Sequence, residues 1–352
     1  MPSSVRARSH SHRVVKKCPC WELNIGIPWL LDIRIGVHGA VSGVCQAVVV
    51  ITSAPQPGRP RDPGDAWVQT PSGVKYWGKF GAAGLLAVDA ERGVLLQHRV
   101  SWSHFGGTWG LPGGARHQGE SAVSAALREA AEEAGVPPAA IRPRLLSVNR
   151  VHDGDQLLWS YTTLVGDVTA AFEPVISDSE STELAWVPVG EVDALPLHPG
   201  LAAAWPRLRE LLPVRPVVIV DVANVMGSVP DGWWRDRAGA ASRLLARISA
   251  LAERGVSAEA LSLPEDRWYP RWIAVVEGEA KAVAQGPAGV SLTRAEASGD
   301  DAIVAEAVAQ LAAGQRVTAV TTVVTSDRAL SARVREAGAT VRGARWLLDL
   351  LT

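Results

Sequence analysis

Apolar and polar residues alternate in two different ways along the chain, and each way predicts its own folded body. In the first, short apolar runs are separated by turn residues, which is typical of strands. An Ala-rich stretch over residues 121–134 instead carries its charges at helical spacing. The predicted strands of this body cover residues 83–88, 93–99, 156–168 and 182–187, and a closing helix is predicted over 206–212.

The second pattern begins at Pro216, where apolar runs alternate with helical stretches. Residues 217–221 form a continuous apolar run that ends in an acid, as expected for a strand buried on both faces of a parallel sheet. Further strands are predicted over residues 272–276 and 317–325, and helices over 237–254, 300–313 and 329–337. This order favours a parallel sheet with helices on its faces, so the chain is placed in the α/β class.

The two bodies and a preceding tail give three predicted segments. Residues 1–70 hold a long basic stretch and an apolar stretch broken by glycine and charge, a poor match to a secretory signal. We interpret them as a disordered extension or as the result of a start site assigned too early. The bodies are expected over residues 71–213 and 214–352. Pro213 and Pro216 flank Val214 and Arg215, which are interpreted as a hinge.

Composition narrows the class of protein. The length of 352 residues suits two domains. With 35 basic and 36 acidic residues, any nucleic-acid contact must come from a local patch rather than from bulk charge. All three cysteines lie in the first 45 residues, which excludes disulfides and cysteine-bound zinc from both bodies. No stretch is long and apolar enough to favour a membrane protein, and a cytoplasmic location is expected.

Residues 114–136 carry the first candidate site. Glu129, Glu132 and Glu133 stand at i, i+3 and i+4, so three carboxylates crowd one face of the predicted helix. A hard divalent cation such as Mg²⁺ would offset their repulsion, because it takes oxygen ligands. Glu120 and Arg128 are candidates for an ion pair that orients these acids. A solvated acidic helix is the alternative, but it does not account for the spacing of Gly114, Glu120, Arg128 and Gly135.

That spacing resembles the signature of the Nudix hydrolases at every fixed position. It reads Gly114, five residues, Glu120, seven residues, then Arg128-Glu129-Ala130-Ala131-Glu132-Glu133-Ala134-Gly135. The resemblance covers roughly residues 76–212. It implies an α-β-α sandwich that hydrolyses a nucleoside diphosphate linked to another group, with Mg²⁺ or Mn²⁺ as cofactor.

The resemblance also assigns roles position by position. Glu132 and Glu133 would be metal ligands, and Glu129 a ligand or general base, so these three are the expected catalytic residues. The Gly114 carbonyl is a further candidate ligand, and Glu120 and Arg128 are supporting residues. The family often adds an acid from a late loop, for which Glu180 is the candidate and Glu183 the second choice.

The substrate is left open among nucleoside triphosphates, nucleotide sugars and damaged nucleotides. Four rings near the motif are candidates for a base-stacking pocket, although aromatic residues beside strands are as often part of a core. They are Trp102, His104, Phe105 and Trp109. His198 is open between a capping, packing or binding role.

A second set of polar residues follows the predicted strands of the C-terminal body. Because the carboxyl ends of parallel strands converge on one crevice, these residues are expected to form a Mg²⁺ site for phosphodiester cleavage. The expected metal ligands are Asp221, Asp300, Asp301 and Asp327, with Asn224 in support and Glu277 or Glu279 as possible additions. Taken singly, each of these acids is better explained by a structural role, which for Asp300, Asp301 and Asp327 is the capping of a helix.

Together these residues resemble the PIN-like/NYN ribonuclease superfamily over about residues 216–352. The resemblance implies a parallel sheet flanked by helices and a metal-dependent nuclease acting on single-stranded RNA. Val222 stands where the family more usually has glycine. A bulky side chain there would narrow access to the site, which bears on nuclease activity rather than on the fold. Nearby rings and arginines are candidates for RNA contacts, namely Trp233, Trp234, Arg235, Arg237 and Arg328.

Three functions therefore remain open. In the first, both bodies are hydrolases. In the second, the C-terminal body is a catalytically silent nucleic-acid or regulatory binding module. In the third, the Nudix-like body is a nucleotide sensor that controls a nuclease. The sequence leaves the oligomeric state undetermined.

Overall fold

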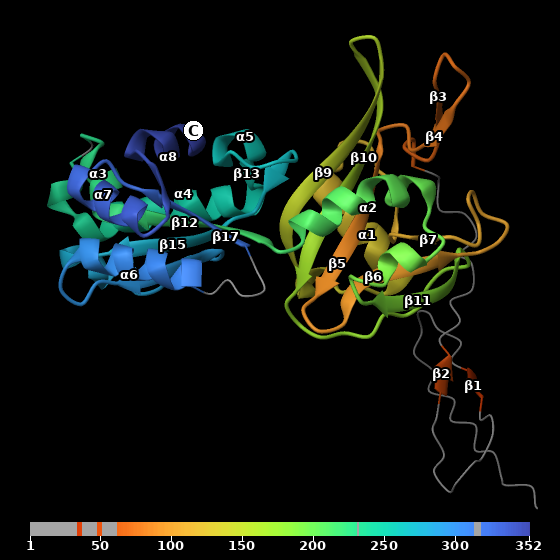
Figure 1. Ribbon diagram of the computed structural model, residues 1–352, viewed down its shortest axis with the longest axis horizontal. Coiled ribbons are helices and arrows are strands. Elements are labelled where there is room, and N and C mark those ends of the chain that lie inside the picture. Colours follow the sequence, from red (N-terminus) through yellow and green to blue (C-terminus); the bar gives the residue numbers. More distant parts are fainter. Residues whose placement is uncertain (1–33, 37–47, 51–61, 231, 313–317) are drawn as a thin grey trace, which may run out of the picture. The chain divides into compact units, whose positions relative to one another are not determined.

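The computed structural model describes residues 34–36, 48–50, 62–230, 232–312 and 318–352 (Figure 1). The chain divides into two compact units, Met1–Arg59 and Pro60–Thr352. In the first unit, β1 (Arg34–Gly36) pairs antiparallel with β2 (Val48–Val50). The expected disordered extension covered residues 1–70, and its described end instead forms a strand, β3 (Trp67–Gln69). The rest of that expectation, apart from β1 and β2, lies outside the described residues.

A nine-stranded sheet forms the first body of the second unit. Its strands run in the order β11-β6-β5-β10-β9-β14-β13, with β7 added to β6 and β8 to β5. The bounds are β5 (Ala82–Asp89), β6 (Gly93–Arg99), β7 (Trp109–Gly110), β8 (Gly113–Ala115), β9 (Ile141–Asp153), β10 (Gln156–Val168), β11 (Ser181–Val187), β13 (Val256–Ser257) and β14 (Arg267–Trp268). A separate hairpin joins β3 (Trp67–Gln69) to β4 (Lys75–Trp77). The four strands predicted here are confirmed, whereas β9 was not predicted.

Successive residues of β5 face opposite sides of this sheet, and both sides are covered. Leu85 belongs to an apolar cluster with the alanines of α1 (Ala122–Ala134). Leu86 belongs to another cluster, with Trp205 of α2 (Pro199–Leu211). Because side chains alternate along a strand, the two helices cover opposite faces. The closing helix begins earlier than predicted and contains Pro206.

The second body is built on a parallel sheet in the order β16-β15-β12-β17-β18. Its strands are β12 (Val214–Asp221), β15 (Arg271–Val276), β16 (Val290–Arg294), β17 (Thr318–Val324) and β18 (Thr340–Arg342). Its α-helices are α3 (Val222–Gly227), α4 (Arg237–Arg254), α5 (Ala258–Leu261), α6 (Gly299–Ala312), α7 (Arg328–Glu336) and α8 (Ala344–Leu350). Each body also has two short 3-10 helices. The first body has η1 (Pro138–Ala140) and η2 (Val192–Ala194), and the second has η3 (Trp233–Arg235) and η4 (Gly278–Ala282).

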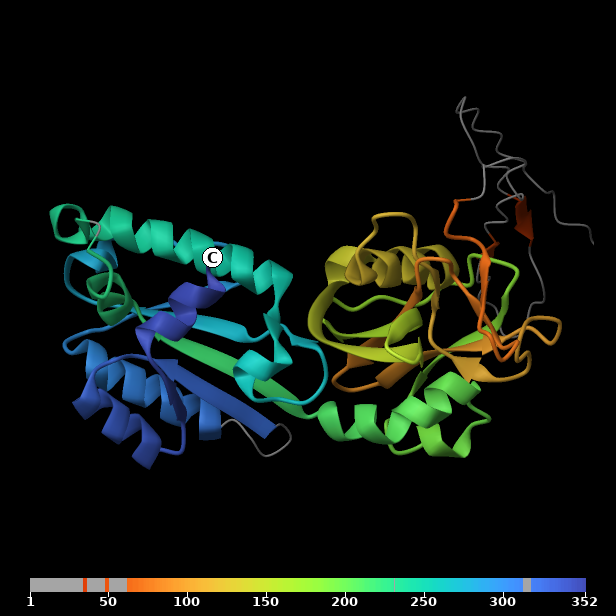
Figure 2. The same cartoon turned by 90° about the horizontal axis from the view of Figure 1, so that it is seen from above.

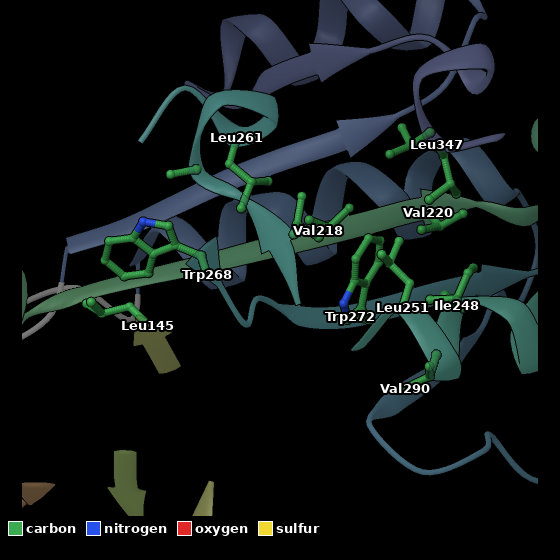
Figure 3. Packing of buried hydrophobic residues seen from close by; sticks show 14 of the residues in the cluster. Leu145, Val218, Val220, Ile248, Leu251, Leu261, Trp268, Trp272, Val290 and Leu347 are labelled. Atoms are coloured by element: carbon green, nitrogen blue, oxygen red, sulfur yellow. The ribbon is translucent and has the colours of Figure 1, made fainter. Parts of the chain in front are cut away.

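Helices cover both faces of the parallel sheet, as the sequence pattern predicted. Ile219 packs in a cluster with residues of α6 and α7. Val218 and Val220 pack with residues of α4 and α8 (Figure 3). Figure 2 shows α4 on one side of the sheet and α6 and α7 on the other.

The predicted hinge at Val214 and Arg215 is wrong. Both residues lie in β12, where Val214 pairs with Thr318 and Arg215 with Ala319 of β17. The two prolines suggested a flexible break, but the segment between them gains a ladder of hydrogen bonds from the neighbouring strand. The Arg215 guanidinium also binds the Leu212 carbonyl, so this connection is held in place.

Residues 256–268 follow the first body in the chain and yet extend its sheet. Trp268 of β14 pairs with Leu145 of β9, and both belong to one apolar cluster (Figure 3). The Asp266 carboxylate accepts a hydrogen bond from the backbone N–H of Val148 at 2.9 Å and pairs with Arg150. The boundary at residues 213 and 214 stays a prediction.

None of the helices in the described residues has the length and apolar character needed to cross a membrane.

Candidate functional site

Helix α1 and strand β8 bring the acidic motif together. Ser121 caps the helix by accepting a hydrogen bond from the Ser124 N–H, and Gly135 ends it at φ 62°. The helix contacts β8, which places Glu129 over Gly114. A Cβ atom at position 114 would lie 2.8 Å from the Glu129 carboxylate, so a larger residue would force that side chain to move.

Arg128 holds the acids of the motif in place. Its Nε and Nη2 donate to the two carboxylate oxygens of Glu120 at 2.9 and 3.0 Å. Its Nη1 donates to Glu129 at 2.9 Å and to Glu132 at 3.2 Å. Nη2 also donates to the Ala115 carbonyl. The ion pair predicted between Glu120 and Arg128 is therefore present, and it reaches two of the three motif acids.

Glu133 is the most buried acid of the motif, with 9% of its surface exposed. Its Oε2 accepts a hydrogen bond from the Gly113 N–H at 2.9 Å. Burial raises the pKa of the Glu133 carboxyl to about 8, against that hydrogen bond. The charges of Glu129, Asp178 and Glu180 contribute to the same rise. A bound cation would stabilise the charged form at this position.

Glu133, Asp178 and Glu180 form a carboxylate cluster. One oxygen from each lies within 4.8 Å of the others. The Asp178 carboxylate also accepts hydrogen bonds from the Glu180 N–H and the Ser181 hydroxyl, which fixes the loop before β11. Three carboxylates at this separation are a suitable donor set for a hard divalent cation.

The remaining acids of the motif lie outside this cluster of three. Glu129 is turned toward Arg128 and Gly114, and burial raises the pKa of its carboxyl, although Arg128 opposes the rise. Glu132 has 52% of its side chain exposed and contacts Arg128. The structure thus brings Glu180 to Glu133, as expected.

Asp178 was missed by sequence reasoning. Its only signal was its place two residues before Glu180, where an aspartate commonly forms a turn with the following backbone. Glu183, the second choice for the late acid, lies in β11 and outside the carboxylate cluster.

In the C-terminal body, the polar residues meet at the carboxyl edge of the parallel sheet. Asp221 ends β12 and accepts hydrogen bonds from the Asn224 N–H at 3.0 Å and the Thr325 hydroxyl at 2.9 Å. Asn224 Oδ1 accepts one from the Ser326 N–H at 2.8 Å. Glu277 follows β15 and accepts one from the Gly299 N–H at 2.9 Å. These bonds link the end of β12 to the segment after β17, and the end of β15 to the start of α6.

These acids influence one another electrostatically. Burial raises the pKa of Asp221, and the charges of Asp300 and Glu277 add to the rise. Burial likewise raises the pKa of Asp300, with further increases from Asp327, Glu277 and Asp301. The predicted convergence is thus observed, but among the described residues no three acids of this body come as close together as the carboxylate cluster.

Three other predicted residues have clear local roles. Asp301 pairs with Arg333 at 2.6 Å. Asp327 caps α7 by accepting a hydrogen bond from the Leu330 N–H, which agrees with the capping alternative. Val222 is completely buried in an apolar cluster, so its side chain packs in the core.

Comparison with known proteins identifies the family to which the first body is similar. The model of the NUDIX domain matches residues 78–210. A protein from Mycobacterium tuberculosis named putative 8-oxo-dGTP diphosphatase 3 is 50% identical over 154 residues, which are 42% of this chain and 70% of that protein. The chain belongs to the Nudix family. It is accordingly a Nudix hydrolase of the pyrophosphohydrolase type, as the acidic motif implied.

Two further Nudix proteins match about the same share of this chain. A nucleoside triphosphate pyrophosphatase/Nudix hydrolase fusion protein from Bifidobacterium longum is 40% identical over 41% of this chain and 31% of its own length. The solved structure of the Nudix hydrolase RenU from M. smegmatis is 46% identical, covers 42% of this chain and 94% of its own, and has a TM-score of 0.40.

Proposed function

We propose that the Nudix body catalyses Mg²⁺-dependent hydrolysis of a nucleoside diphosphate linked to another group. Of the three substrate classes that the sequence leaves open, a nucleoside triphosphate, in normal or oxidised form, is favoured by the names of two relatives. The observation that carries the proposal is the carboxylate cluster of Glu133, Asp178 and Glu180 beside the Nudix motif.

Each acid has a proposed part in this reaction. Glu133 and Glu180, with Asp178, hold the cation, and Glu132 and the Gly114 carbonyl complete its ligands. Glu129 is a ligand or the general base, positioned by Arg128 at 2.9 Å. When bound, the metal neutralises the diphosphate and lowers the pKa of a bound water. Glu120 supports the site through Arg128.

The test compares Glu133→Gln and Glu180→Gln with Glu183→Gln in the full chain. Each of the first two removes a carboxylate from the cluster, and we expect kcat/KM for a nucleoside triphosphate with Mg²⁺ to fall by about 100-fold or more. Glu183 lies outside the cluster, so its variant keeps wild-type activity. Released phosphate and pyrophosphate are measured separately to identify the bond that is cleaved. Unchanged hydrolysis by Glu133→Gln would contradict the assignment.

As a second function, we propose that residues 214–352 form a PIN-like domain that binds Mg²⁺ and cleaves single-stranded RNA. The proposal is supported by Asp221 and Glu277 at the ends of β12 and β15 and by Asp300 at the start of α6, because the charges of Glu277 and Asp300 both act on Asp221. Trp234 is 55% exposed, and the Arg237 guanidinium lies over the Trp233 ring at 5.4 Å, so a base and a phosphate both find suitable partners there. These substrates are consistent with a cytoplasmic location, which remains part of the proposal.

Labelled single-stranded RNA distinguishes this function from its alternatives. We expect Asp221→Asn and Asp300→Asn to abolish Mg²⁺-dependent cleavage, while Asp349→Asn, an exposed acid of α8, leaves it unchanged. RNA binding without cleavage by the wild type would instead identify a binding module. Cleavage that changes when a nucleotide is added would favour the Nudix body as a sensor.

A further inference from the structure

Gln97 is a polar residue within the apolar core of the Nudix body. It follows Leu95 and Leu96 in β6, and its side chain is fully buried. Leu95 packs in the cluster that holds the alanines of α1, and side chains two residues apart in a strand face the same side. Gln97 therefore lies on the face of the sheet that α1 covers. Burying an amide is costly unless it is hydrogen-bonded, so its partner matters.

The Gln97 amide begins a chain of hydrogen bonds that ends at the carboxylate cluster. Its Nε2 donates to the Ser181 hydroxyl oxygen at 2.7 Å. The same hydroxyl donates to Oδ1 of Asp178 at 3.1 Å. Because the amide supplies the proton of the first bond, the single proton of the hydroxyl is left for the carboxylate. The chain therefore runs from Gln97 through Ser181 to Asp178.

The pairing of β11 with β6 places Ser181 between these two partners. Ser181 is buried at the start of β11, and the register against β6 shifts before Glu183. Such irregularities re-aim side chains and are frequent next to active sites. Thr182, at the shift, has an exposed hydroxyl that contacts Nδ1 of His98 at 2.6 Å. Two side-chain pairs thus join the same strands, and only the buried one leads to the carboxylate cluster.

Backbone hydrogen bonds hold both ends of the loop that carries Asp178. The Ser177 N–H donates to the Glu133 carbonyl at 3.2 Å. Beyond Asp178, the Glu180 carbonyl accepts a hydrogen bond from the Val100 N–H at 2.9 Å. Neither of these bonds reaches the Asp178 carboxylate, so the direction of that side chain depends on its own contacts.

Both hydrogen bonds to the Asp178 carboxylate go to the same oxygen. Oδ1 accepts one from the Glu180 N–H and one from the Ser181 hydroxyl, each at 3.1 Å. None of the described residues donates to Oδ2. A carboxylate that is held at one oxygen presents the other to a ligand, and metal-binding carboxylates are commonly oriented in this way.

We propose that Gln97 and Ser181 are positioning residues that orient Asp178 for the cation of the carboxylate cluster. The amide directs the hydroxyl proton to Oδ1, and the hydroxyl leaves Oδ2 for the cation. Without the amide, the hydroxyl is free to turn to other acceptors. The inference rests on the proposed Mg²⁺-dependent hydrolysis, and it adds two residues outside the acidic motif.

The first test measures binding of Mn²⁺ to the full chain from the paramagnetic resonance signal of the free ion. We expect Ser181→Ala to weaken binding by about tenfold, a usual effect of removing a group that orients a metal ligand. Ser181→Thr keeps the hydroxyl and should bind almost like the wild type. Gln97→Met keeps a long side chain without the donor, and its affinity should lie between those of Ser181→Ala and the wild type. Thr182→Val is the matched control, because it removes the exposed hydroxyl of the neighbouring pair.

The double variant Gln97→Met/Ser181→Ala tests whether Gln97 acts through Ser181. If it does, the double variant binds Mn²⁺ no more weakly than Ser181→Ala, whereas independent effects would multiply. Hydrolysis of a nucleoside triphosphate at increasing Mg²⁺ gives a second readout. The variants should need more Mg²⁺ for the half-maximal rate and recover most of kcat at saturating Mg²⁺, while urea unfolding shows that the fold is retained.

Two results would overturn the inference and leave the proposed hydrolysis intact. One is wild-type Mn²⁺ affinity in Ser181→Ala, and the other is a double variant in which the two single effects multiply. Mn²⁺ binding that depends on Gln97 and Ser181, in a protein that hydrolyses none of the nucleotides, would instead contradict the proposed function alone.

Discussion

At the scale of single residues, buried charges in the Nudix body are held by specific partners. Arg128 makes hydrogen bonds to Glu120, Glu129 and Glu132, so removing it would leave several partly buried acids without a counter-charge. Glu133 has no arginine partner among the described residues, and its carboxyl is the one whose pKa burial raises to about 8. This contrast between paired and unpaired acids supports the proposed cation site at Glu133.

His198 predicts how stability depends on pH. It caps α2 by accepting a hydrogen bond from the Gly200 N–H, and burial, with the charges of Arg99 and His104, lowers its pKa from 6.5 to about 4. The unfolded chain takes up a proton near pH 6.5 and the folded chain only near pH 4. The contribution of His198 to the free energy of unfolding is therefore lost as the pH falls from about 6.5 to about 4.

The variant His198→Asn replaces the capping ring nitrogen with a capping oxygen and removes the titration. Between pH 7.5 and pH 5, we expect the wild type to lose about 1 kcal/mol more free energy of unfolding than the variant, a value reduced for partial exposure of the ring. Urea unfolding at the two pH values measures the difference. An identical pH dependence in both proteins would show that His198 is protonated equally well in the folded chain.

At the scale of elements, the motif depends on the close approach of helix α1 to strand β8. Gly113 and Gly114 lie in β8, which pairs with β5, while Glu129 and Glu133 project from α1 onto them. The helix and the strand therefore position the acids jointly. A change in their separation alters the site without removing any of its polar groups.

Gly114→Ala tests this arrangement. The added methyl group would lie 2.8 Å from the Glu129 carboxylate and displace it from Arg128. We expect a loss of about 1–3 kcal/mol in the free energy of unfolding and a fall of at least about tenfold in kcat/KM. Gly190→Ala is the matched control, because a Cβ there meets no atom within 4 Å. Equal activity of the two variants would argue against a role for the close approach.

At the scale of the whole molecule, the unit Pro60–Thr352 has a core that the two sheets share. Trp268 is fully buried, donates from its indole N–H to the Pro264 carbonyl at 2.7 Å, and lies in the same cluster as Leu145. Its strand β14 adds to β9 of the Nudix sheet. The stability of the Nudix body should therefore depend on residues far beyond its matched range.

Trp268→Ala is expected to lower the free energy of unfolding by about 3–5 kcal/mol, the usual cost of removing a buried tryptophan. Nucleotide hydrolysis should be lost at a correspondingly lower temperature. Trp234→Ala, in which an exposed ring is removed, serves as the control and should unfold like the wild type. Thermal unfolding followed together with residual activity measures both effects. Loss of structure confined to residues 214–352 would contradict a shared core.

The sequence by itself determined the elements whose patterns are local. The strands over 83–88 and 93–99, the acidic helix and the alternation after Pro216 depend on neighbouring residues, and all are present. Strand β9 was missed because its pattern is irregular, with the buried arginine Arg144 among its inward-facing positions. The Nudix motif was recognisable because most of its residues lie on one helix and the loop before it.

Only the tertiary structure decided which distant residues meet. Asp178 and Glu180 reach Glu133 through the pairing of β11 with β6, and Trp268 reaches Leu145 through the pairing of β14 with β9. Neither contact leaves a periodic trace in the chain, because the partners are separated by many residues. Local spacing thus determined the helix that carries the acids, while long-range strand pairing completed the carboxylate cluster.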